Sequence, residues 1–557
     1  MLRLTRRDLL AGLIGTSAGL LAGCESRDPT LPPAGEILAP NFSIGHRIRD
    51  GFRPRPGSGR WQETDVVVIG GGISGLAAAW RLRREGLERF VVLELETVPG
   101  GTSRSGTSSL TAYPWGAHYV PVPMAENHSL IAILREMGII ERLDADGTPI
   151  VAEQYLCRDP SERVFCDGAW QEGIYPNEGA TEHDLDELRA FRAEVARWAA
   201  WRDGKGRRAF AIPVSTGSDD PEVTALDSIS MSEWIRQHGW TSPRLLWLID
   251  YSCRDDYGAT SAQTSGWAGL FYFASRVGGA DGESQPLITW PEGNGRIVQH
   301  LTNQVRQHLY CGLAVVDVAP KKVRDTAMVE ISAVDVQTGD AVGFRAQRAV
   351  FAAPQLLAPY LIPELSEERK RSAREFQYSP WLVANLHLSA RPRERGFPLC
   401  WDNVVYDSRS LGYVTATHQT GIDYGPTVLT WYSALCGDGS VDPSTTPSAA
   451  RQQLFDLTWA EAAEIVLSDL ELAHPEIRSL VERLDIMKWG HAMVRPRTGF
   501  VFSHARRTAA TALGPIHFAG TDLSGVALCE EAVYHGVRAA EEALRALGRT
   551  VNSLVEI

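Results

Sequence analysis

A glycine-rich turn near residue 70 has the residue types and spacing that bind a nucleotide pyrophosphate. Gly70 permits a tight turn, Gly72 lets the backbone approach phosphate oxygens, and Gly75 allows close helix–strand packing. Ile73 and Ser74 open the segment that follows, where a helix N-terminus offers unpaired N–H groups to phosphate. We therefore predict a bound dinucleotide. The alternative is a glycine-rich turn in another α/β fold.

Apolar runs on either side of this turn predict a strand, a helix and a second strand. Residues 65–69 have strand length and enter the turn, and residues 91–93 lead into Glu94. Glu94 follows Gly75 by about 20 residues, the spacing at which an acid accepts hydrogen bonds from an adenosine ribose. Because strand, turn, helix, strand and acid fall in register, we predict a βαβ dinucleotide-binding unit with Glu94 as the ribose ligand.

Four motifs beyond the turn give the chain a family resemblance. A glycine pair stands at 100–101, Trp-Gly-Ala-His-Tyr at 115–119, Pro-Glu-Gly at 291–293 and Gly-Thr-Asp at 520–522. In this order they resemble the FAD-binding signature of the flavin amine oxidase superfamily, which includes monoamine and polyamine oxidases, protoporphyrinogen oxidase and phytoene-desaturase-like enzymes. The resemblance implies FAD as the cofactor. We expect noncovalent binding, because no cysteine or histidine matches a position of covalent flavin attachment.

The resemblance also implies which residues hold FAD. Asp522 is expected at the ribityl chain, Val315 at the adenine side, and Ala532 in a helix whose N-terminus points at the flavin ring. Thr102 stands where many members have an arginine, and Arg104 is the nearest substitute. The remaining expected contacts come from the glycine turns and their neighbours: Gly101, Gly116, Ala117, His118 and Gly520.

The fold class that these motifs predict is α/β, with a Rossmann-like FAD-binding domain of the glutathione-reductase type interleaved with an α+β substrate domain. A long amphipathic helix is expected near 449–470 in the second part of the substrate domain. We expect a signal peptide at 1–24, a Pro-, Gly- and Arg-rich linker at 25–61, the FAD-binding domain at 62–125, 287–364 and 487–545, and the substrate domain at 126–286 and 365–486.

The chain departs from typical amine oxidases at the expected flavin face. Those enzymes usually hold a lysine, linked by water to flavin N5, in a strand that resembles residues 381–388, and this chain has no lysine between Arg371 and Met487. Leu528 or Cys529 stands where one of two flavin-facing aromatic residues is expected. These departures favour a dehydrogenase or desaturase that uses a quinone or another acceptor. The substrate is expected to be a small amine or an apolar molecule.

Two histidines are candidates for catalysis. His118 lies in the Gly-Ala-His-Tyr turn, where a side chain with a pKa near neutrality suits proton transfer, and the alternative is a histidine that only holds the turn. His491 precedes the last FAD-binding motif, where family members place substrate-facing residues. Four aromatic residues are candidates for a substrate cavity, although aromatic residues at strand spacing more often belong to a core: Trp381, Trp401, Trp431 and Tyr432.

Composition narrows the function further. The formal net charge of −13 argues against a nucleic-acid partner, and the eight cysteines lack the spacing of metal ligands, so no metal is expected. Cys157 and Cys166 flank a predicted hairpin, and we expect two free thiols there because the protein would fold in a reducing cytoplasm. Besides an oxidoreductase, an FAD-containing isomerase and a flavin-bearing scaffold with little turnover remain open.

The N-terminal residues predict export and a lipid anchor. Arg6 and Arg7 precede a short apolar run, which is typical of a Tat export signal. Leu-Ala-Gly-Cys at 21–24 resembles a bacterial lipobox, so Cys24 is the expected lipidation site, with an ordinary signal peptide as the alternative. The protein is therefore expected on the periplasmic side, held to a bacterial membrane by its N-terminal lipid.

The lipid anchor gives the first prediction. One acyl chain binds a membrane only marginally, whereas several chains hold a protein firmly. We therefore expect Cys24→Ser to move the protein from the membrane fraction to the soluble fraction, measured by immunoblotting of fractionated cells. Arg6→Lys with Arg7→Lys should keep it in the cytoplasm. Continued membrane association of the Cys24→Ser protein would contradict the lipobox.

Overall fold

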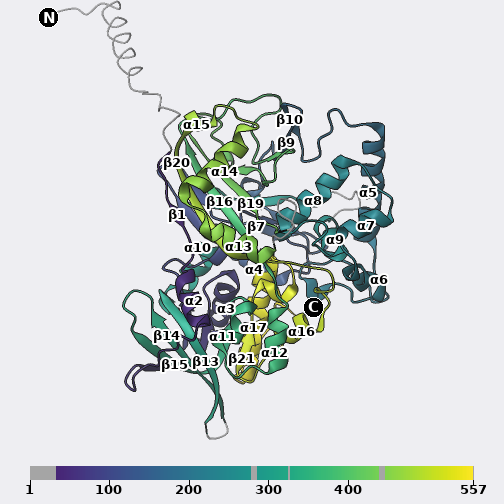
Figure 1. Cartoon of the computed structure of the whole chain (residues 1–557). Helices are drawn as coiled ribbons and strands as arrows, with labels where there is room; N and C mark the ends of the chain where they lie inside the picture. The colour runs from purple at the N-terminus through teal and green to yellow at the C-terminus, as the bar shows by residue number, and fades with distance from the viewer. Residues whose placement is uncertain (1–32, 278–284, 324–325, 438–445, 556–557) are drawn as a thin grey trace, which may run out of the picture.

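The computed structural model describes residues 33–277, 285–323, 326–437 and 446–555. Two large sheets organise these residues, with the first sheet in the lower part of Figure 1 and the second in the upper part. The first sheet has seven strands in the order β12-β3-β2-β15-β14-β13, with β21 beside β15. Its strands are β2 (Trp61–Ile69), β3 (Phe90–Glu94), β12 (Leu309–Cys311), β13 (Leu313–Val323), β14 (Thr326–Asp335), β15 (Ala341–Phe351) and β21 (Ile516–Phe518).

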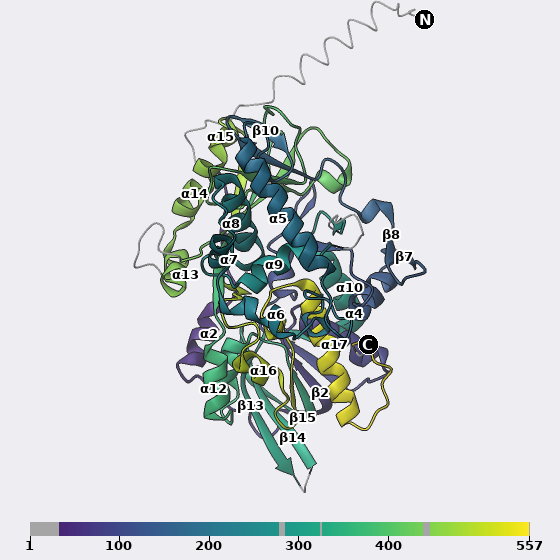
Figure 2. The same ribbon diagram turned by 90° about the vertical axis from the view of Figure 1, so that its right-hand side faces the viewer.

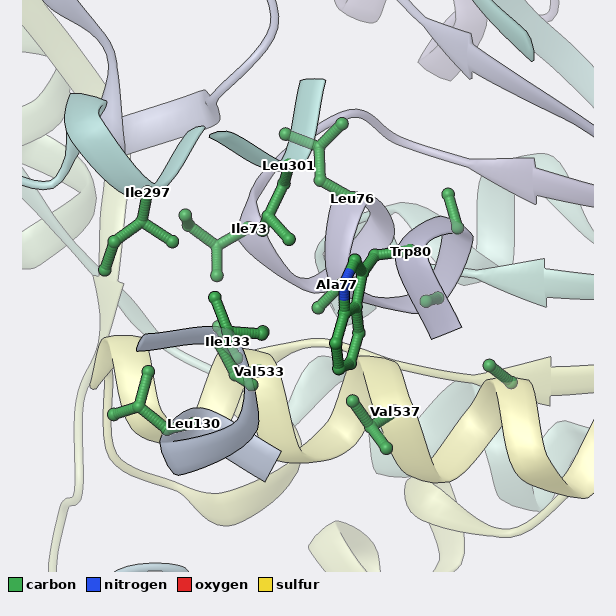
Figure 3. Close-up of a cluster of buried hydrophobic side chains, with 14 of the residues drawn as sticks. Ile73, Leu76, Ala77, Trp80, Leu130, Ile133, Ile297, Leu301, Val533 and Val537 are labelled. Carbon is green, nitrogen blue, oxygen red and sulfur yellow. The ribbon is translucent and has the colours of Figure 1, made fainter. Parts of the chain in front are cut away.

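The centre of the first sheet is parallel and covered on both faces. β2 pairs in parallel with β3 and β15, and Val66, Val67 and Val68 are fully buried. A continuous apolar run is what a strand buried on both faces requires. Helices α3 (Ile73–Arg84) and α17 (Cys529–Ala546) lie on one face, where they pack with α4 (His128–Glu136) and α10 (Gly295–Val305), as Figure 3 shows.

Close packing between α3 and α17 depends on a glycine. A Cβ at Gly536 would overlap the carbonyl oxygen of Ser74, so only glycine lets the last long helix touch the start of α3. Ile73, Leu76 and Val533 fill the adjoining contact (Figure 3). The helix that follows the glycine turn is therefore fixed by a segment from the other end of the sequence.

The second sheet has eight strands in the order β1-β20-β16-β19-β18-β17-β9-β10. Helices α13 (Pro447–Asp456) and α14 (Trp459–Glu471) pack against it through contacts with β16 and β20. Its strands are β1 (Ile37–Leu38), β9 (Glu162–Cys166), β10 (Ala169–Glu172), β16 (Tyr378–Leu388), β17 (Asp402–Val405), β18 (Tyr413–Thr415), β19 (Thr427–Ala434) and β20 (Val481–Val494).

A helical layer stands beside the second sheet and faces the viewer in Figure 2. Its helices share one aromatic-rich core that includes Phe191, Trp234 and Trp267. They are α5 (Glu182–Ala200), α6 (Pro221–Thr224), α7 (Met231–Gln237), α8 (Pro243–Tyr257) and α9 (Gly266–Ala274). The remaining elements are α2 (Phe42–Arg49), α11 (Ala358–Leu361), α12 (Glu367–Arg374), α15 (Ile477–Leu480), α16 (His504–Ala510), β4 (Ser105–Thr107), β5 (Ala112–Pro114), β6 (Tyr119–Pro121), β7 (Ile140–Leu143), β8 (Pro149–Val151) and β11 (Leu287–Thr289).

Three expected boundaries need correction. β20 lies in the second sheet, so 487–494 belong with the substrate-side strands rather than with the segment 487–545. α4, expected in the substrate domain, packs in the same core as α3 and α17. The described part of the expected linker, residues 33–61, forms β1 and α2, because Ile44 and Ile48 recur at helical spacing and are buried.

Two local expectations, about one helix and one hairpin, were wrong. The single helix expected near 449–470 is broken between α13 and α14, because Thr458 starts α14 with a capping box to Glu461. The hairpin expected between Cys157 and Cys166 is instead the pair β9–β10. Both thiols are free, as expected.

The N-terminal expectations fall outside what the structure describes. Cys24 and the expected signal peptide precede residue 33, the first residue described. Among the described residues, no helix combines the length and apolar character that a membrane span needs.

Candidate active site

The glycine turn forms a cradle with the loop that follows β3. The Gly100 N–H donates to the Gly71 carbonyl at 2.8 Å, and Gly72 pairs with Gly100 in an isolated bridge. Gly70 has φ +104°, and a Cβ there would lie 2.9 Å from the Ala352 carbonyl oxygen. A Cβ at Gly75 would overlap the Gly70 carbonyl oxygen. The cradle therefore exposes backbone N–H groups at the start of α3, where a pyrophosphate fits.

The expected ribose acid is held by backbone groups. Glu94 is buried, and its Oε2 accepts from the Gly71 N–H at 2.5 Å while Oε1 accepts from the Glu96 N–H at 2.8 Å. Burial raises the pKa of Glu94, and the two backbone hydrogen bonds oppose that shift. Each carboxylate oxygen keeps a further lone pair, so Glu94 has the capacity to accept from ribose hydroxyls.

At the other end of the cradle, Asp522 has one oxygen satisfied and one orphaned. Its Oδ2 accepts from the Tyr378 hydroxyl at 2.6 Å and from the Gln355 N–H at 2.7 Å, whereas Oδ1 is buried without a partner. Ser74 Oγ is also buried and unpartnered. Burial raises the pKa of Asp522 to about 6. Because buried polar atoms rarely lack partners, these two atoms fit a cofactor that supplies hydroxyl and phosphate groups.

The remaining expected cofactor contacts converge on the same region. The Ala117 N–H donates to the Thr102 carbonyl at 3.1 Å, and the Asn294 N–H donates to the Ala117 carbonyl at 3.0 Å. These bonds bring together the glycine pair, the Gly116 turn and the Pro-Glu-Gly turn. Arg104 lies 3.8 Å from the Glu96 carboxylate and 5.2 Å from the Trp489 ring centroid.

Three expected contacts lie on the strands and helices around the cradle. Val315 is buried in β13 within the core that contains Leu93. Gly520 has φ +138° and precedes the short turn that contains Asp522. Ala532 lies in the first turn of α17, where its N–H donates to the Leu528 carbonyl at 3.1 Å.

His118 lies among aromatic side chains from the second sheet and from β6, which pairs with β11. Its ring centroid is 5.2 Å from Tyr432, 5.4 Å from Tyr119 and 5.5 Å from Trp401. Nδ1 is 3.0 Å from the Gly116 carbonyl oxygen, which only accepts, so Nδ1 carries the proton and Nε2 is an acceptor. Burial lowers the pKa of His118 to about 4, so the ring is neutral near pH 7.

Two carboxylates on different elements lie near these aromatic residues. Asp402, at the start of β17, accepts from the Tyr432 hydroxyl at 3.4 Å. Asp255, on α8, makes no hydrogen bond or ion pair within the described residues. Burial and the neighbouring Asp256 raise the pKa of Asp255 to about 7, while burial and Asp255 raise that of Asp402 well above its usual range.

The surroundings of these carboxylates carry excess negative charge. Arg276 is a cation beside them, and it lies 3.4 Å from the Asp256 carboxylate and 3.4 Å from the Tyr119 hydroxyl. Glu530, at the start of α17, is a further buried acid whose pKa burial raises. Arg254 also acts on Asp255, so two arginines stand among four acids. We call the group of His118, Tyr119, Trp401, Tyr432, Asp255 and Asp402 the aromatic–acid hollow.

Two of the residues proposed from the sequence, His491 and Trp431, do not lie with His118. His491 is on β20 beside Tyr378, with ring centroids 6.0 Å apart, and it is exposed. It therefore lies on the Asp522 side rather than among the neighbours of His118. Trp431 belongs to the core of the second sheet and donates to Asp469 at 2.6 Å.

The acids of the hollow were missed from the sequence. Asp402 follows Trp401 without any motif, and Asp255 and Asp256 give no sign of acting as a pair. The only local signal was the neighbouring aromatic residue. Their proximity arises because α8 packs beside the second sheet, which local sequence does not reveal.

One lysine, Lys488, lies on the strand next to the one where amine oxidases usually hold their flavin-linked lysine. Lys488 lies opposite Leu382 on the strand next to β16. Its ammonium donates to the Phe455 carbonyl at 3.1 Å and to the Leu457 carbonyl, so it caps the C-terminal end of α13. It is therefore engaged on the helix-covered side of the second sheet.

The whole arrangement matches a known family. The model of the flavin containing amine oxidoreductase family matches residues 73–544, so this chain belongs to that family. The family confirms a flavin cofactor, and the comparisons confirm the α/β fold of an FAD-binding domain interleaved with a substrate domain. The comparison with curated proteins gave no match.

Solved structures show the same fold at low identity. Putrescine oxidase bound to putrescine is 16% identical with a TM-score of 0.61, covering 88% of this chain and 100% of that chain. Cyclohexylamine oxidase from Brevibacterium oxydans IH-35A is 16% identical with a TM-score of 0.60 and the same coverage. A CLA-producing fatty acid isomerase from P. acnes is 15% identical with a TM-score of 0.59, covering 86% of this chain and 98% of that chain.

The ribose acid gives the second prediction. Glu94→Ala removes the carboxylate that the backbone of Gly71 and Glu96 positions. We expect FAD affinity to fall by roughly 1.5–3 kcal/mol, the usual value of a hydrogen bond to a charged group. Titration of apoprotein with FAD, followed by flavin fluorescence, measures this. Unchanged affinity would show that Glu94 is not the ribose ligand.

Proposed function

We propose that this chain oxidises a small cationic amine by hydride transfer to FAD. The observation that carries the proposal is the aromatic–acid hollow, in which Asp402 and Asp255 lack a compensating cation of their own. Both residues are half-buried. Asp402 accepts a long hydrogen bond from Tyr432, and Asp255 has no hydrogen-bond or ion-pair partner among the described residues. A buried carboxylate without a partner is costly, and a ligand cation lowers that cost.

The aromatic walls support the same substrate class. A cation over the face of tryptophan or tyrosine gains electrostatic attraction from the ring, more when it is desolvated. Trp401 and Tyr432 line the neighbourhood of His118 at ring distances of 5.5 and 5.2 Å. Two of the similar structures are oxidases of the amines putrescine and cyclohexylamine, which agrees with an ammonium substrate.

His118 is placed to accept a hydrogen bond from the substrate nitrogen. Its Nε2 is the free acceptor, because Nδ1 donates to the Gly116 carbonyl, and its low pKa keeps it neutral. The same low pKa makes the ring too weak a base to hold the proton of an ammonium group, so His118 positions the amine, and the ammonium proton leaves to water before hydride leaves the neighbouring carbon. FAD, when bound, supplies the two-electron acceptor. The turn that holds His118 also contacts Thr102, so this acceptor and the cofactor loop are fixed together.

The isomerase alternative has one observation in its favour, since a fatty acid isomerase shares the fold. A fatty acid carries a carboxylate, however, which the excess acids near Asp255 and Asp402 repel. The nearby cations Arg276 and Arg254 are already paired, with Asp256 and Asp250 respectively. A cationic substrate therefore fits this hollow better than an anionic one. Dehydrogenation of an uncharged C–C bond would leave the two carboxylates without a role.

We also propose that the protein is exported and anchored by lipid on the periplasmic side of a bacterial membrane. The support is the twin-arginine segment and the Leu-Ala-Gly-Cys sequence ending at Cys24. A membrane location agrees with electron transfer to a quinone.

Substrate recognition gives the third prediction. Asp402→Asn and Asp255→Asn remove the charges but keep the side-chain shape, so KM for a primary amine should rise by about 10- to 100-fold, equivalent to roughly 1.5–3 kcal/mol. Stopped-flow mixing under anaerobic conditions measures the rate of flavin bleaching. Asp423→Asn is the control, because Asp423 pairs with the exposed side chain of Arg158.

The same assay has a pH signature. Below a pKa of about 7 Asp255 is protonated and neutral, so it attracts a cation less than above that pH. Thus kcat/KM for the amine should rise as pH increases through about 7, and the rise should weaken in Asp255→Asn. Failure of every amine to bleach the flavin, with turnover of a fatty acid instead, would contradict the proposal.

The electron acceptor gives the fourth prediction. A positive charge or fixed water near the flavin assists transfer of electrons to oxygen, and Lys488 is engaged in capping α13. We expect photoreduced enzyme to reoxidise slowly in air and quickly with a quinone or dye. Reoxidation in air as fast as with dye would instead favour an oxygen-using amine oxidase.

A further inference from the structure

The segment that precedes the glycine turn contacts both sheets. β1 is the edge strand of the second sheet and pairs in parallel with β20. Figure 1 shows it beside β20 in the upper part, with α2 in the lower part. The N–H groups of Leu484 and Ile486 donate to the carbonyls of Ala34 and Glu36 at 2.8 and 2.9 Å. A Cβ at Gly35 would overlap the Leu484 carbonyl oxygen. We call residues 34–53 the strap.

The second half of the strap belongs to the FAD-binding side. Ile44 and Ile48 of α2 are buried in the core that contains Leu93 and Phe518. Arg53 donates to the Tyr360 carbonyl, and its guanidinium is 3.9 Å from the Asp317 carboxylate. Between the two halves, Phe42 packs on Phe455 of α13 with ring centroids 4.8 Å apart. The strap is therefore built into both parts of the fold.

The strap reaches the adenosine end of the cofactor cradle through one hydrogen bond. The Asn41 N–H donates to Glu96 Oε1 at 2.6 Å. The Glu96 N–H in turn donates to Glu94 Oε1 at 2.8 Å, and Glu96 Oε2 lies 3.8 Å from Arg104. Asn41 and Glu96 thus fix the loop that presents the ribose acid.

The strap also reaches the opposite end of the cradle. Phe42 and His46 of α2 lie against the Phe455 ring, with ring centroids 4.8 and 6.5 Å apart, and a Cβ at Gly490 would lie 2.6 Å from the same ring. His491, the next residue, neighbours Tyr378, whose hydroxyl donates to Asp522 at 2.6 Å. The strap therefore reaches the Glu94 side through a hydrogen bond and the Asp522 side through Phe455.

We propose that the strap retains FAD, with Asn41 and Glu96 as positioning residues that act through Glu94. FAD is held between segments that the strap joins, so release of the cofactor requires those segments to separate. The strap adds hydrogen bonds and buried apolar contacts that oppose this separation. The proposal rests on the FAD cofactor of the family and is independent of the substrate.

Asn41 offers a matched pair of variants. Its φ of −71° suits proline, so Asn41→Pro removes the N–H that donates to Glu96 with little change of backbone. Asn41→Ala keeps that N–H and removes only the side chain. We expect the rate of FAD release from diluted holoenzyme, followed by the rise in flavin fluorescence, to increase about five- to tenfold in Asn41→Pro and less than twofold in Asn41→Ala. Equal rates in the two variants would overturn the role of Asn41.

A second experiment avoids the risk that a variant fails to fold. Gly57 and Gly59 lie in an exposed turn with open space around them, so a protease site inserted there cuts the chain after folding. The control carries the same site at the exposed Gly204–Gly206 turn. Coupling of two binding equilibria is reciprocal, so if the strap retains FAD, FAD must also retain the cut strap. We expect FAD to raise the binding constant of the cut strap about tenfold, measured as the fraction of strap that stays bound. Equal retention with and without FAD would overturn the proposal.

Discussion

The close approach of α17 to the start of α3 is the constraint on which the rest of the structure depends. Gly536 and Ser74 meet without room for a Cβ, and Gly75 meets the carbonyl of Gly70 in the same way. These contacts place the N-termini of α3 and α17 beside one cradle. The orphaned Ser74 and Asp522 atoms then lie where a cofactor completes their hydrogen bonds. Without this approach the glycine turn would be an ordinary loop.

The acids of the aromatic–acid hollow lower the stability of the fold and serve recognition of the substrate instead. Asp255 and Asp402 are half-buried with little hydrogen bonding, and such desolvated groups reduce the stability of the free protein when ionised. Well-packed apolar residues would serve folding better at these positions. Their presence between aromatic walls is consistent with stability given up for the recognition of charge.

Sequence reasoning predicted what lies close together along the chain. The glycine turn and Glu94 follow from runs and spacings of fewer than about 30 residues, the length of a βαβ unit. The two-domain fold was instead implied by the resemblance of motifs spread along most of the chain to one family. Asp255 and Asp402 have no such signal, because they meet only through the packing of α8 beside the second sheet. The strap was hidden by its Pro-, Gly- and Arg-rich composition, in which Ile44 and Ile48 alone mark the buried face of α2. The break before Thr458 was readable from its capping box and was overlooked.

The strand order of the first sheet determines how late during synthesis the protein can complete its folding. β15 lies between β2 and β14 and also pairs with β21, so its neighbours come from segments hundreds of residues apart. Pairings of this kind carry a high cost of loop closure and make folding slow. The nascent chain therefore emerges with β2 unpaired on one edge and with the Ala-rich face of α3 waiting for α17. During synthesis these surfaces are exposed to self-association, which makes this protein a natural client for chaperones until its last helix is complete.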